Sequence, residues 1–146
     1  MTENKSADIN TEYCIVRPKI IKKILFCDDS KLIRDCVRPH LSAYGIDFAE
    51  CLEDVIDKLK NPNEYKVVIS DVNLPDGEGL KIIEDIRKVY EGTFYLVSIL
   101  KCDDQSLKRQ AIIHKVNRVF FDGIGDDIRN LIEEIQKLFN SQDNSK

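Results

Sequence analysis

Three acidic residues directly follow two apolar segments that have the length and composition of buried strands. Asp71 comes after residues 66–70, a β-branched run, and Asp28 and Asp29 come after residues 23–27. The carboxyl ends of parallel strands lie at one edge of an α/β sheet, and ligands bind at that edge. If the two strands are parallel neighbours, the three carboxylates meet in one small space.

Carboxylates packed so closely repel one another, so either one of them stays protonated or a cation neutralises the group. Oxygen ligands suit Mg²⁺, which typically takes one or two carboxylates together with waters and a phosphate oxygen. Beside such an ion, Asp71 could attack phosphorus as a nucleophile and form an aspartyl phosphate. The ion would also stabilise charge on the transferring phosphoryl group. The pattern therefore predicts a Mg²⁺-dependent phosphoryl acceptor.

The rest of the chain alternates strand and helix patterns, which implies a parallel sheet with helices on both faces. A flavodoxin-like strand order of 2-1-3-4-5 would place the strands that end at Asp28 and Asp71 side by side. We thus expect an α/β fold with a five-stranded parallel sheet flanked by five helices. The expected strands cover residues 19–27, 46–50, 66–70, 94–100 and 119–121, and the expected helices cover 30–44, 52–59, 80–90, a segment opened by Asp104 or Ser106, and 126–139.

Apolar spacing predicts the inner faces of these helices. Ser30 can cap the first helix, Pro39 should bend it, and Gly45 is a natural stop. The residues expected to face the core are Ile33, Cys36, Val37, Leu41 and Tyr44 in the first helix, Ile82, Ile83, Ile86 and either Val89 or Tyr90 in the third, and Leu107, Ala111 and Ile112 in the fourth.

A length of 146 residues indicates one domain. We expect an N-terminal extension over residues 1–21 that is partly disordered, a domain over residues 22–140 and a polar tail over residues 141–146. Within the extension, residues 13–16 form either a short added strand or a packed arm.

Composition excludes several functional classes. The net charge of −4 argues against binding to nucleic acid or to anionic lipid. The five cysteines include no C-x-x-C pair, so reduced thiols are expected in place of a zinc site or disulfides. The sequence has no apolar run of membrane-spanning length and no signal peptide, so we expect a cytoplasmic protein.

The pair Asp28-Asp29, the single Asp71 and the loop D-x-x-L-P-x-G-x-G-L resemble the receiver domain of response regulators in bacterial two-component signalling. The resemblance covers residues 22–138. It implies that Asp71 is the phosphoacceptor, that Asp29 and Asp71 bind Mg²⁺ directly together with the backbone carbonyl of Asn73, and that Asp28 binds it through water.

The same resemblance implies partners and activity. A histidine kinase or a histidine phosphotransfer protein would donate the phosphoryl group. The domain would catalyse its own phosphorylation and dephosphorylation, and it would bind a downstream protein target through the face formed by its last two strands and helices.

One family position is not matched at the end of the fifth strand. Receivers usually have Lys-Pro there, and the lysine pairs with the acyl phosphate, whereas this chain has Asp122-Gly123. Two unit charges ~5 Å apart at an effective dielectric of ~20 interact by about 3 kcal/mol, so an inward Asp122 would weaken phosphoryl binding. Asp122 is either such a pocket acid or an outward turn residue.

The fourth strand of a receiver usually ends in Thr or Ser. Ser98 is the candidate switch hydroxyl here, although counting along the chain places that position nearer Ile99 or Leu100. Lys101 is a candidate for the missing positive charge. The aromatic switch position falls at Val119 or Phe120, so a tyrosine switch is absent.

Three functions follow from these residues. The first is a stand-alone receiver that accepts a phosphoryl group on Asp71 and signals through partner binding. The second, suggested by Asp122, is a degenerate pseudo-receiver that binds proteins without being phosphorylated. The third is a Mg²⁺-dependent phosphatase with an aspartate nucleophile, but those enzymes usually have D-x-D after the first strand, where this chain has D-D-S.

Overall fold

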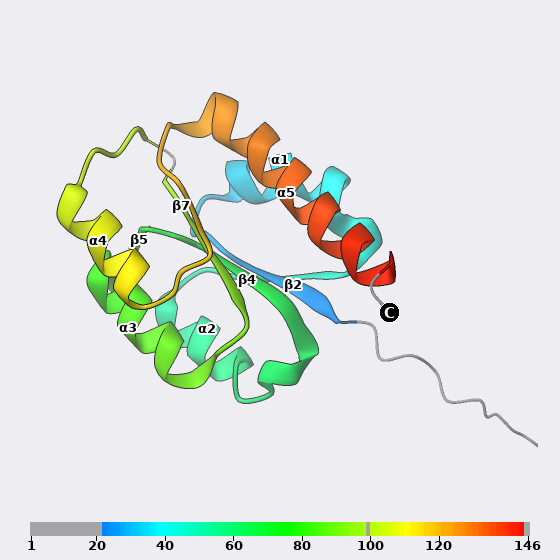
Figure 1. Ribbon diagram of the computed structural model, residues 1–146, viewed down its shortest axis with the longest axis horizontal. Helices are drawn as coiled ribbons and strands as arrows, with labels where there is room; N and C mark the ends of the chain where they lie inside the picture. The colour runs from blue at the N-terminus through cyan, green and yellow to red at the C-terminus, as the bar shows by residue number, and fades with distance from the viewer. Residues whose placement is uncertain (1–21, 99, 145–146) are drawn as a thin grey trace, which may run out of the picture.

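The computed structural model describes residues 22–98 and 100–144, and for residues 124–127 and 141–144 it describes the backbone alone. Five parallel strands form one sheet in the order β3-β2-β4-β7-β8, as Figure 1 shows. In chain order this is 2-1-3-4-5, so the predicted fold is confirmed. The strands are β2 (Lys23–Cys27), β3 (Ile46–Ala49), β4 (Tyr65–Asp71), β7 (Thr93–Val97) and β8 (Arg118–Phe120).

Helices cover both faces of the sheet. Figure 1 shows α1 (Lys31–Leu41) and α5 (Ile124–Asn144) on one face and the other three on the opposite face. Side chains of β2 alternate between the two resulting cores, since Ile24 packs with the α1 and α5 residues and Leu25 packs with the others. The helices on the second face are α2 (Leu52–Lys58), α3 (Leu80–Val89) and α4 (Gln105–Ile113).

Helix boundaries follow the expected local chemistry. The Ser30 hydroxyl accepts a hydrogen bond from the Ile33 N–H at 3.3 Å, and the Asp104 carboxylate caps α4 in the same way. The first helix continues through Pro39 to Leu41 and then tightens into a 3₁₀ turn, η1 (Ser42–Tyr44). A second 3₁₀ turn, η2 (Pro62–Glu64), precedes β4.

Two predicted inner-face positions are wrong, since Ile112 is 75% exposed and Cys36 is also exposed. Of the two alternatives at the end of α3, Tyr90 is buried and Val89 is exposed. The reason is angular, because residues in an α-helix are separated by about 100°. Ile112 lies about 140° around the axis from Leu107, whereas Ala111 lies about 40° from it and is buried.

Several element ends also differ from the prediction. The fourth strand of the sheet ends at Val97 and not at residue 100, the fifth is shifted one residue earlier, and α5 begins at Ile124. This helix extends to Asn144, past the boundary drawn at residue 140. The loop after Asp71 contains an antiparallel hairpin that the sequence did not predict, formed by β5 (Asn73–Leu74) and β6 (Gly77–Glu78). Residues 13–16 and Ile99 lie outside the described residues.

In the described part of the chain, no helix is long and apolar enough to cross a membrane. The four cysteines of that part are free thiols.

Candidate functional site

The three acidic residues lie together at the carboxyl edge of the sheet. One carboxylate oxygen from each of Asp28, Asp29 and Asp71 lies within 4.8 Å of the other two. The strand register explains this, because β2 and β4 are hydrogen-bonded neighbours in which Cys27 is paired with Ser70. Asp28, which follows Cys27, and Asp71, which follows Ser70, are therefore side by side.

Asp28 is held rigidly. The side chain is 2% exposed, and Oδ1 accepts a hydrogen bond from the Ser30 N–H at 2.8 Å. Its backbone carbonyl accepts a hydrogen bond from the Arg34 guanidinium at 2.8 Å. Burial raises the pKa of Asp28 to about 6, even though the Ser30 hydrogen bond and the Arg34 charge act to lower it.

Asp71 is the last residue of β4 and is also buried. Burial, followed by the charge of Asp28, raises the pKa of Asp71 to about 7. The Asn73 N–H donates a long hydrogen bond of 3.4 Å to Asp71 Oδ1, which favours the charged form and only partly offsets the rise. Asp29 is exposed and forms the open side of the group.

This donor set fits a divalent cation. Two carboxylates are buried beside a third, and burial raises the pKa of both above the ordinary value, which a nearby cation would offset. An all-oxygen set at a sheet edge is the chemistry that Mg²⁺ prefers. Asn73 begins β5, two residues beyond Asp71, so its carbonyl belongs to the same edge of the sheet.

Ser98 is the first residue after β7. Its neighbour Val97 is the register partner of Asp71, so Ser98 lies beside the acidic edge. The Ser98 N–H donates to the Phe120 carbonyl at 2.8 Å, and its hydroxyl donates to the Leu100 carbonyl. The hydroxyl is thus bonded to its own loop in this structure.

Asp122 follows the end of β8 and is exposed. It is not among the three carboxylates that lie within reach of one ion. Lys101 is also exposed, in the loop that connects β7 and α4.

Sequence reasoning missed two residues near the site. Arg34 fixes the backbone of Asp28 and forms an ion pair with Glu50 at 3.4 Å. Asp76, at the turn of the hairpin, binds two backbone amides of α2. The only sequence signal for Arg34 is its position one helical turn after Ser30, and Asp76 has none beyond its place in the loop.

Residues 24–121 match the family described as the response regulator receiver domain. This match covers more than half of the chain, and the chain belongs to that family. Among curated proteins, the chain is 30% identical over 131 residues to the chemotaxis protein CheV3 of Helicobacter pylori. That alignment covers 80% of this chain and 40% of CheV3, so the chain spans less than half the length of this relative.

Solved structures share the fold. A CheY-like response regulator receiver domain protein from Methanospirillum hungatei superposes with a TM-score of 0.68 at 22% identity, covering 86% of this chain and 99% of that one. The signal receiver domain of an HD domain-containing protein from Pseudomonas fluorescens gives a TM-score of 0.68 at 21% identity, covering 90% and 96%. At these identities the likeness shows the fold alone.

Proposed function

We propose that this receiver domain accepts a phosphoryl group on Asp71 in a Mg²⁺-dependent reaction and signals by binding a protein target. The observation that carries the proposal is the group of three carboxylates within 4.8 Å at the end of β2 and β4. Asp29, Asp71 and the Asn73 carbonyl would hold the ion directly, and Asp28 would hold it through water. When bound, Mg²⁺ would lower the repulsion among the carboxylates and offset charge on the phosphoryl oxygens.

Asp71 would act as the nucleophile. One ionised carboxylate oxygen of Asp71 attacks phosphorus in a phosphohistidine of a histidine kinase or a histidine phosphotransfer protein. A new P–O bond forms as the P–N bond breaks, and the released imidazole takes a proton from solvent. Hydrolysis of the acyl phosphate returns inorganic phosphate and the free carboxylate.

The other residues would position and desolvate the nucleophile. Asp71 lies on the central strand of the sheet, where pairing with β2 and β7 fixes its backbone. Asp28 is fixed by Ser30 and Arg34, so the acidic edge is organised before any ligand enters. Ser98 is the tentative switch residue, whose hydroxyl would exchange the Leu100 carbonyl for a phosphoryl oxygen.

The proposed target surface is the face of β8, α4 and α5. Ile112 and Ile113 on α4 are 75% and 65% exposed, which is a large apolar exposure for adjacent residues. A groove of about 370 Å³ lies beside them, lined by Lys108, Ala111, Ile112, Val116, Asn117, Arg118 and Val119. These features support binding of a protein partner.

Intact-mass measurement tests the proposal. The full chain is incubated with Mg²⁺ and acetyl phosphate, and we expect one phosphoryl adduct that Asp71→Asn abolishes. Asp57→Asn, an exposed carboxylate on α2, is the matched control and should keep the adduct. Omission of Mg²⁺ should also abolish it. Failure of the wild-type chain to form the adduct with acetyl phosphate or with a phosphorylated histidine donor would contradict the proposal.

The second candidate is a pseudo-receiver that acts as a phosphorylation-independent binding module. Asp122, at the position where receivers usually have lysine, favours it. This candidate predicts no adduct under the same conditions and partner binding that survives Asp71→Asn. Turnover of phosphomonoesters would instead support the phosphatase reading.

A further inference from the structure

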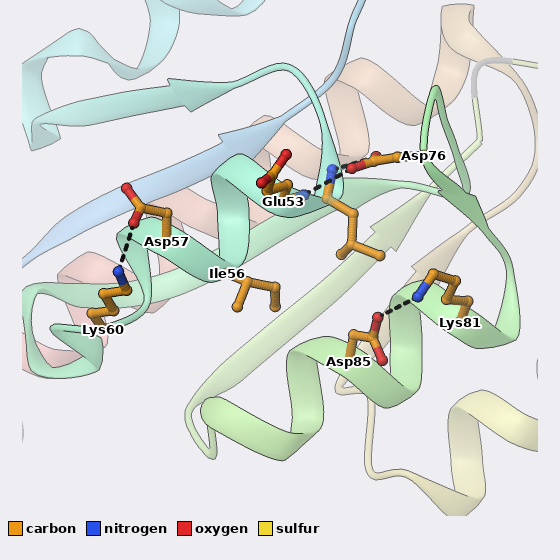
Figure 2. A pocket seen from close by; sticks show the side chains of 8 residues that line it. Glu53, Ile56, Asp57, Lys60, Asp76, Lys81 and Asp85 are labelled. Carbon is orange, nitrogen blue, oxygen red and sulfur yellow. Dashed lines mark hydrogen bonds and ion pairs between the residues drawn. The ribbon is translucent and has the colours of Figure 1, made fainter.

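The first turn of α2 is capped by a residue from another part of the chain. Cys51, at the N-cap position, makes no side-chain capping bond. Instead, Asp76 Oδ1 accepts a hydrogen bond from the Leu52 N–H at 2.7 Å, and Oδ2 accepts one from the Glu53 N–H at 3.0 Å. Figure 2 shows Asp76 reaching from the hairpin to the start of the helix.

Two further contacts join the hairpin to α2. A Cβ atom added at Gly77 would lie 2.9 Å from Leu52 Cδ2, so the hairpin backbone lies closely against this leucine. Leu74 of β5 and Leu52 are buried in the same core cluster. Although desolvation acts to raise it, hydrogen bonds from the Leu52 and Glu53 amides hold the pKa of Asp76 below its usual value.

The same hairpin is attached directly to the acidic edge. Asn73 donates its N–H to Asp71 Oδ1, and the Gly79 N–H donates to the Val72 carbonyl at 2.8 Å, which closes the loop at its base. Only a short hydrogen-bonded segment therefore separates Asp71 from Asp76. Because hydrogen bonds restrain the backbone of this segment, a shift of Asn73 should also move Asp76 and the first turn of α2.

We infer that Asp76 is a positioning residue, which by capping α2 holds the β5–β6 hairpin and its Asn73 carbonyl in the orientation that binds the metal ion. The inference rests on the proposed function. It has two consequences. Loss of the cap weakens Mg²⁺ binding, and Mg²⁺ binding changes the environment of the backbone amides in the first turn of α2. Asp76 itself does not touch the ion or the phosphoryl group.

Mg²⁺ affinity of full-length variants, measured by calorimetry, tests the first consequence. Loss of a residue that orients a metal ligand typically weakens metal binding by about tenfold or more, and we expect Asp76→Ala to raise the Mg²⁺ dissociation constant by roughly three- to tenfold. Asp57→Ala is the matched control, since it removes an equal charge from the groove shown in Figure 2 without touching the cap.

Two conservative variants separate positioning from charge. Asp76→Asn loses the charge but keeps one acceptor oxygen, so its dissociation constant should fall between those of wild type and Asp76→Ala. Asp76→Glu keeps the charge on a longer side chain, so it should bind Mg²⁺ more weakly than wild type. The inference is overturned if the alanine variant matches wild type, or if glutamate matches wild type while asparagine matches alanine.

The second consequence is tested in the wild-type chain, which needs no variant to fold. Addition of Mg²⁺ should shift the NMR signals of the Leu52 and Glu53 amides and slow their hydrogen exchange. Unmoved signals, in a chain that binds Mg²⁺, overturn the inference and leave the proposed function standing. A wild-type chain that binds no Mg²⁺ overturns both.

Discussion

Asp71 and Asp28 are buried side by side, and this arrangement opposes folding when both are ionised. Each carboxylate has left water without gaining a cationic partner at its oxygens in the described part of the chain. A residue that destabilises the folded state in this way is typical of a functional site. This cost of burying two carboxylates should make the stability of the protein depend on pH.

We predict that the metal-free protein becomes less stable as the pH rises from 5 to 8. The pKa of Asp71 is about 7 in the folded chain against an ordinary value of 3.8, so the folded state binds more protons than the unfolded state in this range. The free energy of unfolding therefore decreases with rising pH, by on the order of 2–4 kcal/mol in total. Urea denaturation in EDTA measures it.

The Asp71→Asn variant is the control for this prediction. It removes the carboxylate but keeps its shape, so the variant should be more stable than wild type at pH 8 and should lose most of the pH slope. A wild-type stability that rises between pH 5 and 8 would show that the folded pKa of Asp71 is not raised.

Asp122 is the residue whose replacement should most directly improve phosphoryl retention. We predict that Asp122→Lys forms the acetyl phosphate adduct faster or holds it longer, by roughly three- to tenfold, because a carboxylate that follows β8, two strands away from β4, is replaced by an ammonium. The exposed position limits the effect to about 1 kcal/mol. Time-resolved intact mass measures it, and Asp122→Asn should give a smaller change. An unchanged adduct lifetime would place the residue outside the field of the site.

Among single residues, the sequence predicted the acidic residues of the site but not the residues that hold the surrounding backbone in place. Asp28, Asp29 and Asp71 were predictable because strand ends place them. Arg34 and Asp76 were not, because they bind backbone carbonyls and amides, and a backbone group gives no residue type for a pattern to recognise.

The elements themselves were predicted from apolar spacing, with errors where two apolar residues compete for one direction. In α4, Leu107 and Ala111 are buried, and the neighbouring Ile112 had to point elsewhere. The β5–β6 hairpin was missed because strands of two residues are too short to show alternation.

Arg87 joins three elements at the amino edge of the sheet. Its guanidinium, at the end of α3, donates to the carbonyls of Tyr90 and Gly92, which precede β7, and to those of His114 and Lys115, which follow α4. These bonds measure 2.7 to 2.9 Å. The fork geometry of arginine allows one side chain to satisfy all of them.

We predict that Arg87→Ala lowers the free energy of unfolding by about 2–4 kcal/mol, because it leaves several carbonyls without a donor. Arg87→Lys should recover only a part, since an ammonium cannot reproduce the planar fork. Lys88→Ala, at the exposed neighbouring position, is the control and should change stability little. Equal stability of wild type and the alanine variant in urea would show that the Arg87 hydrogen bonds do not stabilise the fold.

Across the whole molecule, the two edges of the sheet have opposite characters. The carboxyl edge brings together the carboxylates of Asp28, Asp29 and Asp71, whereas the amino edge is joined by paired groups. There, Asp47 accepts hydrogen bonds from Lys23 and Tyr65 at 3.1 and 2.7 Å, which links three adjacent strands, and Arg87 links the helices. Stability and reactivity are thus separated along the strands.

We predict that Mg²⁺ raises the melting temperature of the whole domain, because only the folded chain brings the three carboxylates together. At ten times its dissociation constant, a ligand stabilises the folded state by about 1.4 kcal/mol, or roughly 3–7 °C for a domain of this size. Differential scanning calorimetry at fixed ionic strength measures the shift. Asp29→Asn should reduce it, and an equal shift with Na⁺ would show that general screening is responsible.

The hydrogen bonds of Arg87 also determine which positions of this chain tolerate substitution. The Arg87 guanidinium donates to backbone carbonyl oxygens, and every amino acid has such an oxygen. Position 114 should therefore accept varied substitutions in a mutational library, and position 115, whose backbone has a φ of 60°, should even prefer glycine over its present lysine. Position 92 should remain glycine for a different reason, because a Cβ atom there would lie 2.5 Å from the Tyr90 hydroxyl. Among the residues that form these hydrogen bonds, the arginine should be the one whose side chain cannot be replaced.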